Sequence, residues 1–356
     1  MNVRWIGAND IAWDTLLSRT AASDVFFSSA YHRACEADGR GQAVLVAMED
    51  GDDVLAQPLL LRPIEQVGSK PIASGRFDAE SAYGYAGPLA SPRVQTAFLE
   101  RAWQAYAEAV SDHGVVAEFI RLHPYLENVR LLPPAYRAFE VRQSVTLELR
   151  GRDAETLWAS YPPAQRNMVR RARTAGLSCR VLKLDDGCTM FHQLYEASMH
   201  RLTAGPDYFF SCAFFESLGA SLDRRAVLIV AEDQSGSVAA AGLFLLGPTT
   251  VHYFLAAADP SSRAPGRANI VLHEAALLGL EHGLDALHLG GGRTGDPDDS
   301  LLRFKLSVSS QRLPVHVAAR VHDVPAYEAL CESWLEQAAT TERPAFHLLY
   351  RLPLPA

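Results

Sequence analysis

The chain has 356 residues, of which 48% are hydrophobic and 21% are charged, and this composition and length suit two globular domains with sizeable cores. The formal net charge of −8 excludes a general attraction to nucleic acid or anionic lipid, so any polyanion must be bound by a local patch. Five scattered cysteines without a C-x-x-C pair suit a reducing compartment better than a secreted disulfide framework. The N-terminal residues contain no apolar run long enough for a signal peptide, so we expect a cytoplasmic protein.

Helix and strand patterns in the first half predict an α+β domain. A helical segment at 28–39 precedes two apolar strands within 43–63, which are separated by an acidic turn that contains glycine. Further along, the stretch 82–92 places Tyr83 and Tyr85 beside a Gly-Pro turn. These tyrosines are candidates for contact with a substrate, although aromatic packing at a strand end is the more common explanation.

A second candidate position follows the apolar strand at 115–120. This strand ends at Arg121 and His123, before a turn fixed by proline. A histidine in that place is a candidate catalytic residue, although a structural histidine is the more common case. Asp153 then has the pattern of a helix cap, and a Pro-Pro pair follows the helix. We therefore expect one domain at 1–150 and a second at 151–356.

The segment 166–183 carries six basic residues and no acidic one. At helical spacing Arg166, Arg170 and Arg173 share one face, while Met168, Val169 and Ala172 turn toward the core. That face has the charge to bind phosphates, and a solvated face balanced by acids elsewhere is the alternative. No aromatic residue is interleaved with these arginines, so base stacking is not predicted from this helix.

An internal repeat indicates that the second half copies the first. The sequences from Ala43 and from Ala226 are near copies 183 residues apart, each with a strand, an acidic turn and a second strand. The second half is predicted to contain helices and then three strands at 226–231, 238–246 and 250–257. A loop, a helix at 268–283 and a strand at 284–291 complete it. That order is α+β, with a mostly antiparallel sheet and a helix packed across it. A Gly-Pro turn interrupts the longest apolar window, so no membrane span is expected.

The loop that begins at Ser261 carries a possible phosphate-binding motif. Arg263, Gly266 and Ala268 fit the Arg/Gln-x-x-Gly-x-Gly/Ala pattern that binds the coenzyme A pyrophosphate in acetyltransferases of the GNAT type. A helix N-terminus of this kind binds phosphates whether they belong to coenzyme A or to a tRNA end, so the loop does not decide between the two. The histidines show no metal-ligand spacing, and no metal site is proposed.

The densest stretch is 288–307. A strand ends in three glycines, which permit close approach of a backbone or a ligand, and an acid-rich capped helix then delivers Phe304 and Lys305 as neighbours. A lysine beside apolar helix positions often only extends its ammonium to the surface. Lys305 is therefore a functional candidate only together with other evidence.

Taken in order, these segments resemble the Fem family of aminoacyl-tRNA-dependent peptidyltransferases, which are built from two GNAT-like domains. The matching pieces run from about residue 25 to residue 305 and include "FFSSAYHRA", "AYGYAGP", "FIRLHP", "RNMVRRARTAGL", "LYEASMHRL", "HYFLAAA", "LHLGGG" and "SLLRFK". The resemblance implies a tandem GNAT-like fold and transfer of an amino acid from aminoacyl-tRNA to an amine of a peptidoglycan precursor or a natural-product intermediate. His123-Pro124 departs from the Asp-Pro pair of many members, and the long coiled-coil arm of some members has no counterpart.

The resemblance also implies roles for individual residues. Lys305 would stabilise the oxyanion of the tetrahedral intermediate and Phe304 would stack on the terminal adenine. The proton of the amine would leave through the substrate or through His123. Arg201 would meet phosphates of the acceptor. The expected acceptor cleft between the domains comprises Tyr83, Tyr85, Arg121, His123, Arg201 and Tyr208, with Tyr253 as a further substrate-binding residue. The expected donor-binding residues are Phe304, Arg263, Gly266, Arg267, Asn269, Arg166, Arg170 and Arg173.

Two other functions remain open on the sequence. The first is an N-acyltransferase that uses acetyl-CoA or another acyl-CoA and acts on a small amine, because a thioester and a tRNA ester present the same kind of acyl carbon. The second is a catalytically inactive binding module on the same double fold. Apart from the acyl donor no cofactor is expected. The expected partners are aminoacyl-tRNA and an amine-bearing peptide or small molecule, and we expect a monomer.

Overall fold

The computed structural model describes residues 1–73 and 75–355. They form two compact units, of which the first comprises Met1–Glu140 with His316–Ala356 and the second Val141–Val315. The chain passes from one unit to the other along two long strands, β9 (Arg137–Glu148) and β15 (Gln311–Val321).

The first unit is built on a mainly antiparallel sheet. The order of its strands is β1 (Asn2–Gly7), β2 (Gln42–Asp50), β3 (Asp53–Pro63), β6 (Phe77–Glu80), β8 (Val115–Arg121) and the end of β15. Only the β6–β8 pair is parallel. The short strand β7 (Leu89–Ala90) pairs with β3, and β4 (Gln66–Val67) forms a hairpin with β5 (Lys70–Pro71).

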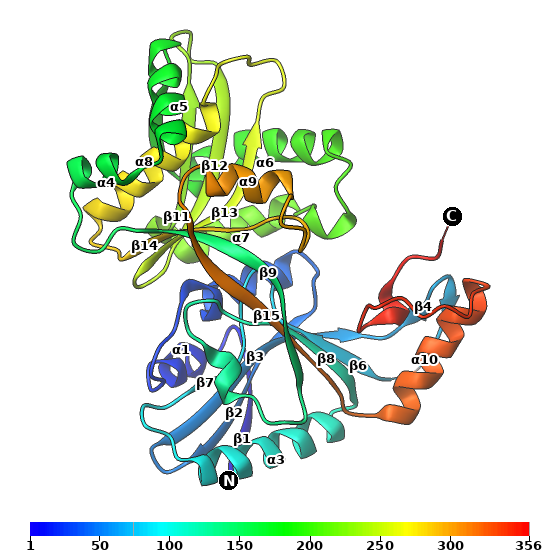
Figure 1. The fold of residues 1–356 in the computed structure, drawn as a ribbon. Coiled ribbons are helices and arrows are strands. Elements are labelled where there is room, and N and C mark those ends of the chain that lie inside the picture. Colours follow the sequence, from blue (N-terminus) through cyan, green and yellow to red (C-terminus); the bar gives the residue numbers. More distant parts are fainter. Residues whose placement is uncertain (74, 356) are drawn as a thin grey trace. The chain divides into compact units, whose positions relative to one another are not determined.

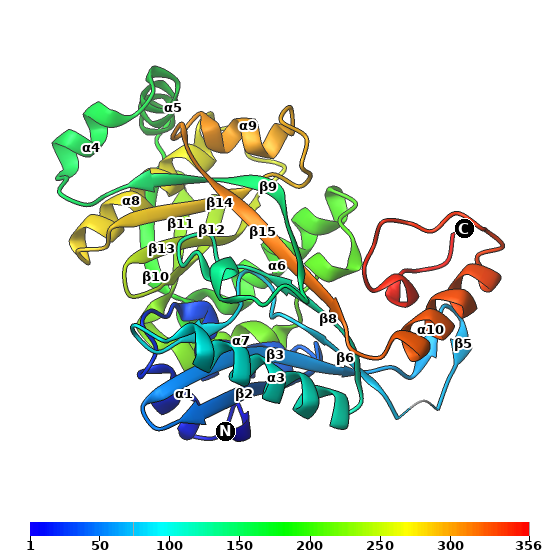
Figure 2. The same cartoon turned by 60° about the horizontal axis from the view of Figure 1, so that its bottom comes forward.

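Helices cover this sheet. Phe98 and Trp103 of α3 (Thr96–Asp112) pack against Val44 and Val46 of β2 in one buried cluster. The helix α10 (Val324–Gln337) lies beside the β4–β5 hairpin (Figures 1 and 2). The remaining helices of the unit are α1 (Ala12–Leu17) and α2 (Ser29–Ala37).

The second unit has the same kind of sheet. Its strand order is the second part of β9, β14 (Ala286–Gly291), β13 (Thr250–Ala258), β12 (Val238–Leu246), β11 (Ala226–Glu232) and β10 (Ser178–Lys183). The helix α8 (Arg267–Glu281) shares a buried cluster with Ile229 of β11, whereas Leu228 faces α6 (Leu184–Arg201) and contacts Gly187. The other helices are α4 (Ala154–Ser160), α5 (Pro163–Thr174), α7 (Cys212–Leu222) and α9 (Ser300–Leu306).

The two units repeat one topology, which confirms the predicted tandem α+β fold. In each unit an antiparallel hairpin (β2–β3 or β11–β12) is followed by a third strand (β6 or β13). A helix (α3 or α8) then crosses to a strand that runs parallel to that third strand (β8 or β14). Each sheet is completed by an antiparallel strand from elsewhere in the chain, since β15 pairs with β8 and β9 pairs with β14.

The compact units differ in one respect from a division at residue 150. Residues 317–321 of β15 pair with β8, and Tyr327 and Trp334 of α10 are buried in a cluster with Val116 and Ala117. The C-terminal segment, which the sequence pattern assigned to the second domain, therefore packs with the first unit. The strands β8 and β15 lie about 200 residues apart in the sequence, and pairing over such a distance leaves no local pattern. Dividing the chain into domains in sequence order therefore assigns this segment to the wrong unit.

The long apolar window forms the β12–β13 hairpin. Its turn is the predicted one, with the amide of Gly247 donating to the carbonyl of Thr250 at 2.8 Å. Among residues 1–73 and 75–355, no helix has both the length and the apolar character needed to cross a membrane.

Candidate functional site

The sheet of the second unit opens between β13 and β14. Within residues 250–291, all of which the structure describes, the two strands pair only from Thr250/Ala286 to His252/His288. Beyond that point β13 continues to Ala258 along β12, and β14 continues to Gly291 along β9 with a register shift between His288 and Gly290, whose φ is +72°. Past His252 and His288 the two strands therefore no longer pair with each other, and a ligand can insert between strands that separate in this way.

Lys305 lies at this opening. Asp299 caps α9 by accepting from the amides of Leu301 and Leu302, and the helix then directs Lys305 back toward β14. The Nζ of Lys305 donates to the carbonyl of Gly291 at 2.7 Å and lies 6.0 Å from the ring centroid of Tyr253. Lys305 is only 7% exposed, so the sequence-based alternative of a lysine that extends to solvent is wrong for this side chain.

Burial changes the charge of this lysine. Desolvation lowers the pKa of Lys305 to about 7, and the nearby Arg142 lowers it further, while Asp299 acts in the opposite direction. Both protonation states are accessible near neutral pH. The group can therefore act as a compact cation or take part in proton transfer without a large free-energy cost.

The glycines before α9 allow close packing of the chain near Lys305. A Cβ atom on Gly291 would lie 2.8 Å from the carbonyl oxygen of Gln143, and one on Gly292 would lie 2.7 Å from Oδ1 of Asp299. Because these positions are glycines, the chain can pack closely against the backbone of β9 and against the side chain that caps α9. This packing places the Gly291 carbonyl within reach of Lys305.

Two aromatic residues flank the lysine. Tyr253 is half-buried and stacks on Phe244 with ring centroids 5.3 Å apart, and burial raises the pKa of its hydroxyl, so it remains a neutral hydroxyl. Phe304 is half-buried against the core of the unit. The structure thus brings Tyr253 and Lys305 together, with Phe304 adjacent in the chain.

The loop before α8 is occupied by packing between helices. Gly266 has a φ of +70°, and a Cβ atom there would lie 2.1 Å from the carbonyl oxygen of Met168 on α5. Asn269 donates to Oε1 of Gln165 at 2.6 Å, and Gln165 donates back to the Asn269 carbonyl at 3.2 Å. Arg267 bonds to the carbonyl of Ser262 within the loop.

Gly266, Arg267 and Asn269 therefore have structural partners that account for their residue types, whereas Arg263 is exposed. The match to a coenzyme A loop does not by itself require coenzyme A. Phosphate binding by these four residues stays a prediction.

The basic face of α5 divides into two parts. Arg166 is held by the carbonyls of Ala159 and Tyr161, at 3.0 and 2.7 Å, at the end of α4. Arg170 and Arg173 are exposed, and their guanidinium carbons lie 5.5 and 5.8 Å from the ring centroid of Trp158.

The sequence pattern did not identify Trp158, because this ring belongs to α4 and is not interleaved with the arginines of α5. The Pro-Pro turn joins α4 to α5, and the packing of the two helices places this ring beside the arginines. A tryptophan before a turn that joins two helices was the available signal. Val169 and Ala172 are buried as predicted, and Met168 is only partly buried.

The expected acceptor residues of the second unit lie around the end of α6. Arg201 is the last residue of this helix and is exposed. Tyr208 is 38% exposed and ends the 3-10 helix Pro206–Tyr208, whose position is held by a 2.8 Å hydrogen bond from the Tyr195 hydroxyl to the Tyr208 carbonyl. Both side chains are accessible to a ligand.

The expected site residues of the first unit include a histidine, His123, whose buried ring is positioned by neighbouring groups. The buried ring of His123 accepts the amide hydrogen bond of Tyr125 at Nδ1, with a length of 3.3 Å, and its Nε2 lies 3.7 Å from Asp24. Since Nδ1 accepts, the ring proton belongs on Nε2, toward the carboxylate. Tyr85 contacts the ring edge-on, with centroids 5.7 Å apart.

Tyr83 and Arg121 have other partners in the first unit. The Tyr83 carbonyl accepts from the Tyr31 hydroxyl. Arg121 pairs with Glu80 at 2.6 Å, and although burial alone would raise the pKa of Glu80, Arg121 and Arg62 lower it. A common cleft for these residues with Arg201 and Tyr208 stays a prediction.

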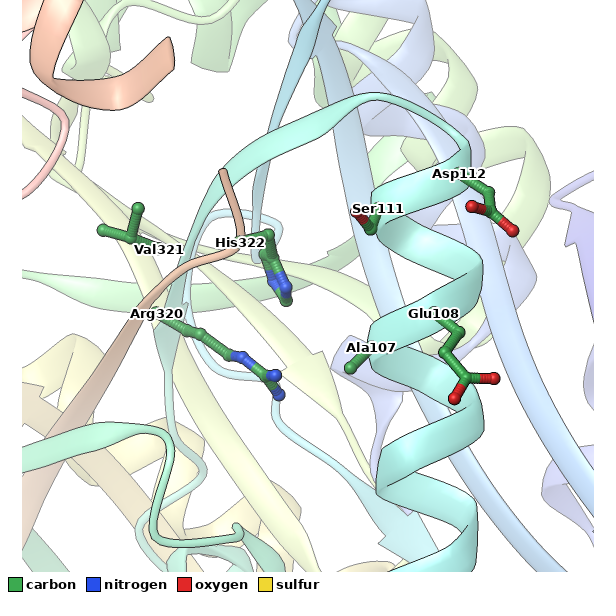
Figure 3. A pocket seen from close by; sticks show the side chains of 7 residues that line it. All are labelled: Ala107, Glu108, Ser111, Asp112, Arg320, Val321 and His322. Atoms are coloured by element: carbon green, nitrogen blue, oxygen red, sulfur yellow. The ribbon is translucent and has the colours of Figure 1, made fainter. Parts of the chain in front are cut away.

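The first unit also contains a polar depression of about 470 Å³ between α3 and the end of β15. Arg320 of β15 and His322, the residue after the end of this strand, point toward α3 (Figure 3). Behind them, Glu118 accepts hydrogen bonds from His322, Tyr106 and Tyr136. The predicted site residues lie outside this lining, so the depression is separate from the candidate site.

Comparisons with known proteins support the fold and its class. Residues 164–306 match the acetyltransferase (GNAT) domain family. The solved structure of FemX is similar to 92% of this chain and 99% of its own, with a TM-score of 0.68 and 13% identity. L-PGS from Bacillus licheniformis matches 92% of this chain and 97% of its own, with a TM-score of 0.55 and 12% identity. A search of curated protein sequences found no match.

A third structure is the C-terminal domain of a protein assigned as a lysylphosphatidylglycerol synthetase from Agrobacterium fabrum. It matches 90% of this chain and 94% of its own, with a TM-score of 0.52 and 13% identity. The chain thus has the Fem-like tandem GNAT fold that the sequence predicted. The acetyltransferase domain match covers α5, the opening between β13 and β14, and Lys305, and it supports acyl transfer as the chemistry of this region.

Proposed function

We propose that the chain is an aminoacyltransferase. It would form an amide bond by moving an amino acid from aminoacyl-tRNA to an amine of a peptidoglycan precursor or a natural-product intermediate. The observation that carries this proposal is the buried ammonium of Lys305 at the opening between β13 and β14, inside the matched acetyltransferase domain. Acyl transfer to an amine needs such a group, because negative charge develops on the carbonyl oxygen of the donor.

The chemistry of the step follows from this placement. An unprotonated amine of the acceptor attacks the ester carbonyl of the donor, and the resulting tetrahedral intermediate carries a full negative charge on oxygen. In its charged form Lys305 stabilises that oxyanion from a site that excludes water. The intermediate then collapses with formation of the amide and release of the ribose oxygen of the tRNA, which takes up the proton that the amine gives up.

Trp158, Arg170 and Arg173 support a nucleic-acid donor. The two exposed guanidinium groups lie over the indole ring and provide cations for phosphates, which are the groups that position a nucleic acid on a protein. The likeness to a structure assigned as a lysylphosphatidylglycerol synthetase also favours transfer of an amino acid.

An acyl-CoA-dependent N-acyltransferase is the second candidate, and the match to the acetyltransferase family favours it. The N-terminus of α8, with the exposed Arg263 before it, would then receive the pyrophosphate of coenzyme A. In both cases the donor is a substrate, and no resident cofactor is proposed.

One experiment tests the donor. The purified chain is incubated with an amine acceptor panel and either charged tRNAs or acetyl-CoA, and product is measured with and without RNase. We expect a tRNA-dependent amide product that RNase abolishes. A product that depends on coenzyme A and resists RNase would reject the proposal in favour of the second candidate. Binding without turnover on either donor would indicate an inactive binding module.

A further inference from the structure

A thiol and an imidazole meet at the start of α7, on a part of the second unit that the proposed function does not use. The Sγ of Cys212 lies 3.1 Å from Nδ1 of His192, which belongs to α6. The other ring nitrogen of His192, Nε2, lies 3.1 Å from the carbonyl oxygen of Phe210. The chain thus joins a nucleophile, a base and a group that orients the base, all within hydrogen-bond distance.

The carbonyl decides the tautomer of the histidine. A carbonyl oxygen can only accept a hydrogen bond, so the ring proton is on Nε2 and donates to Phe210. The lone pair of Nδ1 then faces the thiol of Cys212. If His192 accepts the thiol proton, Nδ1–H donates to the sulfur and the Phe210 contact is kept, so ionisation needs no movement of the ring.

The start of α7, a nearby carboxylate and solvent exposure also affect the sulfur of Cys212. Cys212 is the first residue of an 11-residue helix whose cap, Ser211, accepts from the amide of Phe214, and the positive end of a helix stabilises an anionic sulfur. Glu216 lies one turn further along α7 and acts against the anion. Cys212 is also exposed, so a reagent can reach its sulfur.

The other four thiols are less suited to reaction. Burial raises the pKa of Cys35 and Cys179 to about 12 and that of Cys188 to about 11, and it also raises the pKa of Cys331. Thiols that remain protonated react slowly, because the thiolate is the nucleophile. A reagent that modifies thiols should therefore distinguish Cys212 from them.

We propose that Cys212 and His192 form a reactive thiol site that is modified by small disulfides and other soft electrophiles. His192 Nδ1 takes the thiol proton, and the thiolate of Cys212 attacks one sulfur of a small disulfide. A new S–S bond forms to Cys212, the S–S bond of the reagent breaks, and its second sulfur leaves as a thiolate that takes the proton from His192.

The test uses the full chain and 5,5′-dithiobis(2-nitrobenzoate), with the modified residue located by mass spectrometry. We expect Cys212 to react first, at least about tenfold faster in the folded chain than in the same chain unfolded in guanidinium at equal pH. His192→Gln keeps a donor for the Phe210 carbonyl but cannot accept the proton, and it should lower the folded rate about tenfold. Glu216→Gln should raise the rate, because it removes a negative charge near the sulfur.

Each outcome decides the proposal. Cys212→Ser should abolish the fast reaction, and circular dichroism checks that each variant is folded. The proposal is overturned if Cys212 in the folded chain reacts no faster than in the unfolded chain, or if another cysteine reacts first. An unchanged rate in folded His192→Gln would also overturn it, because the imidazole would then play no part.

Discussion

The ammonium of Lys305 donates a 2.7 Å hydrogen bond to the carbonyl oxygen of Gly291, the last residue of β14. This contact fixes the position of Nζ at the opening between β13 and β14 but satisfies only one of its three possible donors. Because Lys305 is only 7% exposed, a hydrogen bond from a remaining donor to a developing oxyanion would be weakened little by solvent.

Replacing Lys305 should therefore affect turnover more than binding. We expect Lys305→Ala to lower turnover on charged tRNA by about 10²–10³, the usual cost of losing one oxyanion donor. Lys305→Arg should restore little of this, because a planar fork does not fit the place of a compact ammonium. Steady-state kinetics with a fixed donor measures both variants. Wild-type turnover in a folded Lys305→Ala enzyme would remove Lys305 from the mechanism.

The contribution of Lys305 to catalysis should depend on pH. With the pKa lowered to about 7, the ammonium predominates below that pH and is lost above it. The ratio of turnover between wild type and Lys305→Ala should therefore fall as the pH rises from 6 to 8. This ratio cancels the titration of the acceptor amine, which both enzymes share. A ratio that rises with pH would indicate that Lys305 acts as a base.

Lys305 should also make stability depend on pH. Its pKa in the folded chain is about 7, below the 10.5 of an ordinary lysine, so between these values the unfolded chain holds a proton that the folded chain has lost. The free energy of unfolding therefore rises with pH in this window, and the full cost of burying the ammonium applies below pH 7.

Lys305→Met removes this cost. It should raise the free energy of unfolding at pH 6 by about 3 kcal/mol more than at pH 9, since each of the two pH units between 7 and 9 corresponds to about 1.4 kcal/mol. Urea unfolding at the two pH values measures the difference. Equal effects at both would show that burial does not shift the titration of this lysine.

Gly266 and Gly283 form a matched pair for the packing of α5 on α8. Both have positive φ, +70° and +67°, but a Cβ atom meets a carbonyl oxygen at 2.1 Å only at Gly266 and has open space at Gly283. Gly283→Ala should cost about 1 kcal/mol from backbone strain alone. Gly266→Ala should cost at least about 2 kcal/mol more, because α5 must move. Equal losses of stability in denaturant unfolding would contradict the close approach of α5 to Gly266.

The two parts of the basic face should respond differently to substitution. Arg170→Ala and Arg173→Ala should leave stability nearly unchanged and lower the salt dependence of tRNA binding. The slope of log K against log salt should fall by about one unit for each phosphate that the variant no longer binds. Arg166→Ala should instead reduce stability by about 1–3 kcal/mol, because two carbonyls lose a charged donor.

Filter binding at several salt concentrations and thermal unfolding measure these two effects. Arg180→Ala on β10 is the control, since Arg180 is exposed and pairs with Glu232 at 2.6 Å. If the Arg180 variant weakened tRNA binding as much as the Arg170 and Arg173 variants do, the α5 face would not be the site of contact.

Local sequence patterns were sufficient to predict most elements. The strands expected at 226–231, 238–246 and 250–257 occur at 226–232, 238–246 and 250–258, and the helix expected at 268–283 occurs at 267–281. Asp153 caps its helix with a complete capping box. Periodicity, turns and caps depend only on residues that are close together in the sequence, so the sequence alone predicts these features.

Contacts between distant segments were decided only by the tertiary structure. The sequence pointed to Lys305, but only folding showed that its ammonium is buried on Gly291 and has a lowered pKa, because desolvation depends on everything packed around the group. The position of Trp158 under two arginines and the approach of Cys212 to His192 likewise depend on how helices cross. The chain determined which elements form and in what order, and long-range packing determined which side chains meet, since contacts between distant residues leave no periodic signal.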